Sequence, residues 1–133
     1  METGPYDVAE IWEQTGSGPI EALVAHFYEG VAVDPILRPL YPTDLDGARE
    51  RLALFLIQRF GGPTTYSDRR GHPRLRMRHV PFTIGAAERD AWMRVMRAAL
   101  AQVPELAPHR ESIDHYFAGT AEFLVNAPNV EVS

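Results

Sequence analysis

Apolar residues recur every three or four positions along most of the chain, a spacing that places them on one face of an α-helix. The clearest run begins at Ile20 and continues with the apolar positions Leu23, Val24, Phe27, Tyr28 and Val31. A shorter run of the same kind precedes it, at Val8, Ile11 and Trp12. Between the two runs lies the breaker sequence Thr15-Gly16-Ser17-Gly18-Pro19. The pattern therefore predicts two helices joined at glycines.

Three more segments have the helical spacing. The first runs from about Leu45 to Phe60 and ends at Gly61-Gly62-Pro63, where glycine permits a left-handed turn and proline stops the helix. The second begins after Thr83, the predicted N-cap, and reaches Pro104, and the third runs from about His109 to Asn126. No stretch alternates apolar and polar residues for long enough to form a sheet. We predict an all-α fold with a single domain over residues 1–133.

The segment from Pro63 to Pro81 interrupts the helical pattern. It is polar and rich in turn residues, and only the part after Pro73 suits one or two helical turns, because proline fits a first helical position. A connection of this length inside a small domain usually carries function. We therefore expect functional residues in this segment.

Composition narrows the chemistry. The chain has 133 residues, of which 45% are apolar and 23% charged, and a net charge of −5, as in soluble globular proteins. It contains no cysteine, which excludes disulfides, thiolate catalysis and cysteine-held metal clusters. All 13 basic residues are arginine, which excludes Schiff-base lysines and a P-loop lysine. With no secretion signal and no span of about 20 apolar residues, we expect a cytoplasmic protein with no membrane partner.

His79 is the histidine with the most informative position. It closes the irregular segment and precedes Val80-Pro81-Phe82, so we expect its ring to point between apolar walls. From these residues alone, a buried histidine bonded to a backbone carbonyl is the favoured interpretation. The alternative is a single axial ligand to haem iron, which needs one protein nitrogen, a flat apolar slot and cations near its propionates.

Arginines gather in the same segment, and no acidic residue occurs between Asp68 and Glu88. The cluster consists of Arg69, Arg70, Arg74, Arg76 and Arg78. It suits a solvated basic loop, the propionate side of a haem site or a nucleic-acid contact. Because the whole chain is acidic and Tyr66 is the one aromatic residue in the segment, we expect no nucleic-acid partner.

Several motifs together resemble the group II truncated haemoglobins, the small globins of bacteria and plants. They are Phe27-Tyr28, Tyr41-Pro42, the helix with Ala48, Leu52, Phe55 and Leu56 that ends in Gly61-Gly62-Pro63, Tyr66-Ser67, the run from Arg70 to His79, Pro81-Phe82, and Glu88-Arg89-Asp90-Ala91-Trp92. The resemblance extends from about Tyr6 to Pro128. It implies two antiparallel helix pairs, a two-over-two helical sandwich, around haem b.

The resemblance also assigns roles to individual residues. It makes His79 the axial iron ligand and places Tyr28, Tyr41 and Trp92 around the bound gas, with Ala48 and Leu52 beside them. It sets Arg51 and Arg78 near the propionates, with Tyr66 and His72 as further candidates. The apolar slot it implies is made by Phe55, Leu75, Phe82, Val95 and Met96, each equally well explained as ordinary core.

The same resemblance implies a function. Tyrosine O–H and tryptophan N–H groups can line an apolar pocket and still donate hydrogen bonds to bound dioxygen, so oxygen should leave slowly. We therefore expect reversible binding of dioxygen, nitric oxide and carbon monoxide, serving chemistry or sensing rather than bulk delivery. The alternatives are a redox enzyme, peroxidase-like or a nitric oxide dioxygenase, that depends on a separate reductase, and a haem-free helical module that binds anionic partners through the Arg69–Arg78 segment. The sequence leaves open whether the chain forms a homo-oligomer.

Overall fold

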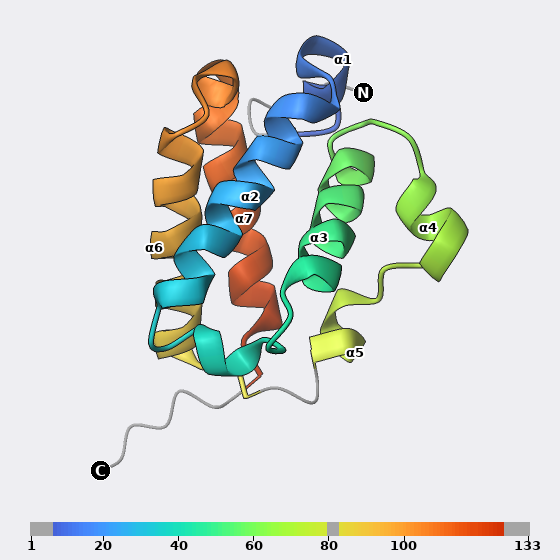
Figure 1. Cartoon of the computed structure of the whole chain (residues 1–133). Helices are drawn as coiled ribbons and strands as arrows, with labels where there is room; N and C mark the ends of the chain where they lie inside the picture. The colour runs from blue at the N-terminus through green and yellow to red at the C-terminus, as the bar shows by residue number, and fades with distance from the viewer. Residues whose placement is uncertain (1–6, 80–82, 127–133) are drawn as a thin grey trace.

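The computed structural model describes residues 7–79 and 83–126, and within these ranges every regular element is a helix. The elements are α1 (Ile11–Thr15), α2 (Ser17–Val33), η1 (Arg38–Leu40), α3 (Asp46–Arg59), α4 (Thr65–Arg70), α5 (Leu75–His79), α6 (Ala86–Ala101), η2 (Pro104–His109) and α7 (Arg110–Leu124). The long helices form two antiparallel pairs, α2 with α3 and α6 with α7 (Figure 1). This arrangement is the two-over-two helical sandwich that the resemblance implies.

The apolar stripes predicted from the sequence form the core between the pairs. The stripe of α2 is buried from Ile20 to Val31, and α6 contributes Met96, Ala99 and Leu100. Gly30 marks the crossing of α2 and α6, because a Cβ at this position would stand 2.5 Å from Cγ1 of Val95. A larger residue there would force the two helices apart.

The short α1 docks onto the C-terminal end of α3. The Trp12 backbone N–H donates to the Phe60 carbonyl oxygen at 2.9 Å, and the Trp12 indole donates to the Ser17 hydroxyl at 2.9 Å. Gly61 ends the α3 segment as predicted and has a φ of +101°. It lies so close to Ala9 that a Cβ on Gly61 would overlap the carbonyl oxygen of Ala9. Only glycine meets both conditions.

Two predicted helix ends are wrong. Helix α6 begins at Ala86 with Gly85 as its N-cap instead of Thr83, and the Gly85 N–H donates to the Glu88 carboxylate at 2.7 Å. Helix α7 begins at Arg110 and ends at Leu124 rather than at Asn126. Both differences have one cause: Ile84 and Asn126 exchange hydrogen bonds with each other, which removes their backbone groups from the helices.

The segment that breaks the helical pattern contains two short helices. The predicted turns after Pro73 correspond to α5, whereas α4 is too short to show a period in the sequence. Helix α4 is fixed to α3 by Gln58, whose amide donates to the Ser67 hydroxyl at 2.8 Å and accepts from the Ser67 N–H at 2.9 Å. Among the described residues, no helix combines the length and the apolar character needed to cross a membrane.

Candidate functional site

His79 is the last residue of α5, and its side chain is half-buried. Its Nδ1 lies 2.6 Å from the carbonyl oxygen of Leu75, one helical turn earlier. Because a carbonyl oxygen can only accept, Nδ1 carries the proton of this hydrogen bond. In the neutral ring the lone pair is then on Nε2, and a carbonyl partner on one ring nitrogen is the usual support of a histidine that binds a metal through the other. The carbonyl-bonded histidine expected from the sequence is thus in the tautomer that an iron ligand requires.

Tyr28, Tyr41 and Trp92 come from distant parts of the chain and lie next to one another. Tyr28 is on α2, Tyr41 follows η1, and Trp92 is on α6. The rings of Tyr28 and Tyr41 are nearly perpendicular, at 89°, with centroids 5.6 Å apart. Trp92 forms a side-chain hydrogen bond with Tyr41, and because an indole N–H only donates, the Tyr41 hydroxyl accepts it. The structure therefore brings together the three residues predicted to surround a bound gas.

Phe27 joins this group, although it is absent from the predicted site. Its ring centroid lies 5.1 Å from that of Tyr28 and 5.1 Å from that of Trp92. Phe117 of α7 also packs against Trp92, with the two ring centroids 5.2 Å apart. Both phenylalanines belong to apolar stripes, and a stripe predicts burial but does not say which buried ring touches a functional one. Phe27 thus fixes the spacing of two predicted site residues.

Burial keeps both phenols protonated. Loss of solvation raises the pKa of Tyr41 to about 12, and the hydrogen bond with Trp92 only partly opposes this. Loss of solvation also raises the pKa of Tyr28, Tyr41 adds to the rise, and Arg51 acts in the opposite direction. Since both values lie far above neutral pH, each hydroxyl can donate a hydrogen bond. Arg51, which is exposed on α3, thus acts electrostatically on the Tyr28 hydroxyl.

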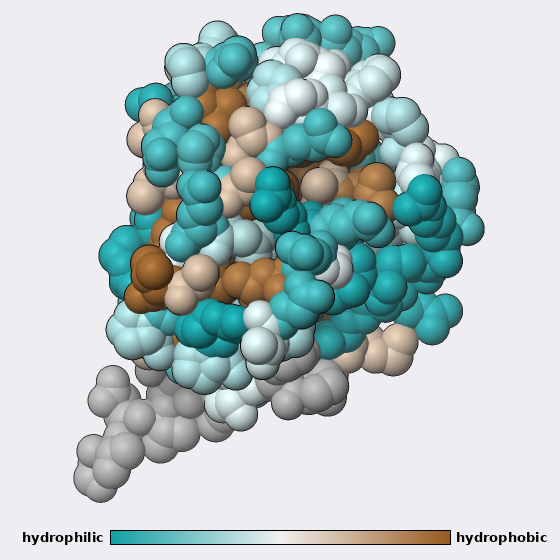
Figure 2. Space-filling model, viewed as in Figure 1, coloured by the Kyte–Doolittle hydropathy of each residue, from teal (hydrophilic) through white to brown (hydrophobic). Residues whose placement is uncertain are grey.

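The residues predicted for the apolar slot fall into two groups. Val95 and Met96 are buried in the core, whereas Phe55 and Leu75 are half-buried and keep apolar surface accessible. Leu52, predicted beside the bound gas, is half-buried as well. Ala48 is buried on α3 with 9% of its surface exposed. Figure 2 shows apolar side chains reaching the surface between α2 and α3, next to hydrophilic side chains over α4. Phe82 lies outside the described residues.

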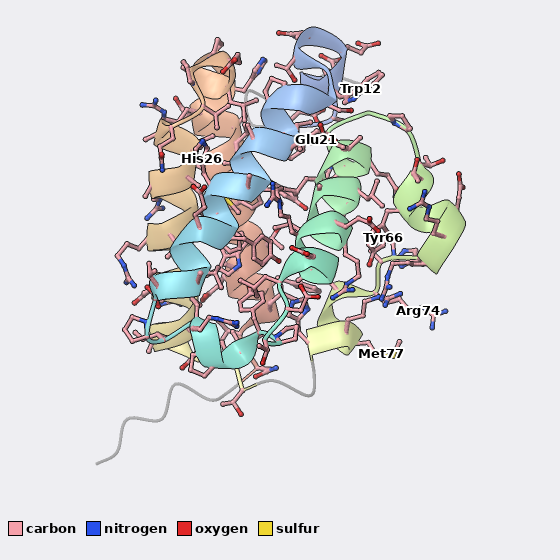
Figure 3. The ribbon with its side chains drawn as sticks, in the orientation of Figure 1. Trp12, Glu21, His26, Tyr66, Arg74 and Met77 are labelled. Carbon is pink, nitrogen blue, oxygen red and sulfur yellow. The ribbon has the colours of Figure 1, made fainter. Side chains whose placement is uncertain are left out.

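The candidates for the propionate side are dispersed. Arg78 donates from Nε to the Pro73 carbonyl at 2.7 Å and from Nη2 to the Arg70 carbonyl at 3.1 Å, so it holds the loop before α5. Tyr66 is buried between α4 and α3 (Figure 3), with its ring centroid 5.5 Å from that of Phe55. His72 is exposed and accepts a hydrogen bond from the Arg74 N–H at 3.3 Å.

The donor chemistry of these residues fits haem. Across residues 7–79 and 83–126, no group of three or more His, Asp or Glu side chains could hold a metal ion. Haem supplies the equatorial ligands of its own iron and needs one protein nitrogen, apolar walls and polar groups for the bound ligand. His79, the accessible apolar surface of Leu52, Phe55 and Leu75, and the hydroxyls of Tyr28 and Tyr41 provide each of these.

Comparison with known proteins agrees with the geometry. The family described as "Bacterial-like globin" matches residues 10–126. The chain is 38% identical over 120 residues to the protein named "Group 2 truncated hemoglobin YjbI" of Bacillus subtilis, covering 90% of this chain and 91% of that protein.

Solved structures give the same result. A thermostable haemoglobin from the actinobacterium Thermobifida fusca superposes with a TM-score of 0.86 at 49% identity, over 90% of this chain and 99% of the other. A truncated oxygen-avid haemoglobin from Bacillus subtilis gives a TM-score of 0.82 at 38% identity, over 86% and 98%. Family match, identity and fold agree, and globins bind haem. This chain belongs to the bacterial-like globins, within the group II truncated haemoglobins.

Proposed function

We propose that this globin binds dioxygen, nitric oxide and carbon monoxide reversibly at the ferrous iron of haem b, with His79 as the axial protein ligand. Tyr28, Tyr41 and Trp92 are proposed to stabilise the bound gas. The observation that carries the proposal is the meeting of three polar rings from distant parts of the chain: the buried Tyr28 lies edge to face with the half-buried Tyr41, and the half-buried Trp92 acts on the Tyr41 hydroxyl. Such donors inside an apolar pocket suit a small ligand that gains negative charge on binding.

Haem supplies the iron to which the gas binds, and this chain supplies the two environments around it. On one side, the Leu75 carbonyl holds the Nδ1 proton of His79, which orients the ring and makes it a better ligand. On the other side, Tyr28 and Tyr41 stay protonated at neutral pH and donate through their hydroxyls. The half-buried Leu52 and the small, buried Ala48 keep the entrance apolar, which limits the access of water.

The donors predict slow release of oxygen. A hydrogen bond to a charged group contributes about 1.5 to 3 kcal/mol, so each well-placed donor slows escape by roughly tenfold to a hundredfold. The similar haemoglobin from Bacillus subtilis is described as oxygen-avid, which supports this expectation. Slow release suits oxygen or reactive-nitrogen chemistry, or sensing, better than delivery. Sustained redox turnover would require a separate reductase as partner.

We assign the propionate side to the polar edge of α3 and to the arginine segment. Arg51 is exposed and close enough to Tyr28 to affect its titration, so it is the first choice for a propionate contact. Tyr66 and His72 are the further candidates from α4 and the loop after it. Arg78 supports the site through the loop carbonyls to which it donates.

A visible absorption spectrum tests the proposal. The purified and reduced protein should show a strong band near the blue end of the visible range, and this band should shift when air or carbon monoxide is added. A protein that purifies without such a band and does not acquire it after haem is added would contradict the proposed function. In that case the haem-free module that binds through the Arg69–Arg78 segment would be the better explanation.

A further inference from the structure

Asn126 links the end of α7 to both sides of the His79 segment. Its backbone N–H donates to the Ile84 carbonyl at 2.9 Å, and its side-chain Oδ1 accepts from the Ile84 N–H at 2.9 Å. Its side-chain Nδ2 donates to the carbonyl oxygen of His79 at 3.2 Å. One side chain thus bonds to two backbone positions that are 42 and 47 residues away in the sequence.

The amide is well suited to this arrangement. It carries an acceptor and two donors on a short side chain, so it can accept from one backbone group and donate to another. The His79 carbonyl stands at the C-terminal end of a helix, where carbonyl oxygens have no partner within the helix. Asn126 provides the partner from another part of the fold.

Helix α5 depends on such contacts because it is only five residues long. A helix of this length is not stable by itself, and its position is set by the groups that bind it. Arg78 fixes the preceding loop, and Asn126 fixes the carbonyl of the last residue. Leu75 fixes the His79 ring relative to α5, whereas Asn126 fixes the end of α5 relative to α7.

We propose that Asn126 is a positioning residue for His79, and that its amide sets the position of the imidazole relative to the haem. This inference rests on the proposed function, in which His79 is the axial ligand. Asn126 does not touch the reacting atoms. It acts through the peptide of His79, so its removal changes the strength and direction of the iron–histidine bond while Tyr28 and Tyr41 stay in place.

The variant Asn126→Asp separates positioning from simple helix termination. Aspartate keeps an oxygen that accepts from the Ile84 N–H but has no N–H to donate to the His79 carbonyl, and its second oxygen repels that carbonyl. Asn126→Ala removes both side-chain bonds. Glu122→Gln is the matched control, because it weakens a different contact of α7, the 2.7 Å ion pair with Arg89.

Three measurements on the haem-loaded protein give the answer: the iron–histidine stretching band in resonance Raman spectra, the rate of haem transfer to excess apomyoglobin, and amide exchange at Ile84. In Asn126→Asp we expect a shifted band and haem transfer about threefold to tenfold faster, with Ile84 still protected. In Asn126→Ala we expect the same band shift and loss of Ile84 protection. The control should match the parent protein in all three measurements.

An unchanged iron–histidine band in both Asn126 variants would overturn the inference, as would an equal shift in Glu122→Gln. Failure of the proposed function looks different. If the parent protein has no iron–histidine band, or if the band survives in His79→Ala, then His79 is not the ligand.

Discussion

The two sides of the candidate site are built in different ways. The hydroxyl and indole side stands on the long helices α2 and α6, where Phe27 packs against both Tyr28 and Trp92. The histidine side stands on a five-residue helix held by hydrogen bonds to backbone carbonyls, from Arg78 and from Asn126. Figure 1 shows this contrast: α2 lies within the helical sandwich, and α4 and α5 lie outside it. Ligand stabilisation is therefore part of the global core, whereas metal ligation belongs to a local unit that can change with little cost to the fold.

His79→Ala is the strongest test of this difference. Without the imidazole we expect loss of stoichiometric haem, while far-ultraviolet circular dichroism keeps most of the helical signal because α2, α3, α6 and α7 do not depend on this side chain. The ratio of haem to protein gives the result. His115→Ala changes an exposed histidine on α7, outside the candidate site, and should retain haem. Full haem retention in His79→Ala would remove the ligand assignment.

Phe27→Ala should affect the whole molecule. The ring is fully buried between Tyr28 and Trp92, and loss of a buried phenylalanine costs about 3 to 5 kcal/mol of unfolding free energy. Denaturant unfolding of the haem-free chain measures this directly. The control is Phe123→Ala, where the side chain is 53% exposed and the loss should be much smaller. Equal losses in the two variants would show that the aromatic group does not carry the stability of the core.

Trp92→Phe should speed oxygen release by roughly tenfold to a hundredfold, because without the indole N–H the Tyr41 hydroxyl loses the partner that orients it to donate to the charged ligand. The haem-to-protein ratio should not change, since the substitution leaves the histidine side intact. Stopped-flow measurement of the oxygen off-rate tests this. Trp12→Phe removes the other indole, which donates to Ser17, and should leave the off-rate as it is. An unchanged off-rate in Trp92→Phe would show that the indole does not contribute to ligand stabilisation.

The smallest effect concerns Asp34, which ties the end of α2 to α6. Hydrogen bonds from the Leu37 and Ile36 N–H groups and the partner Arg94 lower the pKa of this carboxyl. A lowered pKa in the folded state stabilises the protein above the usual value of about 4, and this stability is lost as the pH falls further. Urea midpoints at acid pH should therefore fall more steeply in the parent protein than in Asp34→Asn. Parallel curves would contradict this role.

The sequence predicted the core better than the histidine side. Repeated apolar positions predict α2, α3, α6 and α7, because burial of a stripe depends mainly on spacing. The ends of α6 and α7 were wrong because Ile84 and Asn126 bond to each other across 42 residues, and no local pattern encodes such a pair. Tyr41 lies in an irregular stretch, and the family resemblance rather than periodicity selected it. That His79 is the iron ligand is still a prediction, supported by its tautomer.

The two tryptophans lie in different regions of the molecule, so their fluorescence can report on each region. Trp12 holds α1 against the end of α3 through its backbone N–H and against the start of α2 through its indole N–H, whereas Trp92 lies among the rings of the candidate site. Haem close to an indole quenches its fluorescence by energy transfer, and detachment of α1 would change the emission wavelength of Trp12. Single-tryptophan variants would therefore follow cofactor uptake and local opening separately, without any attached dye.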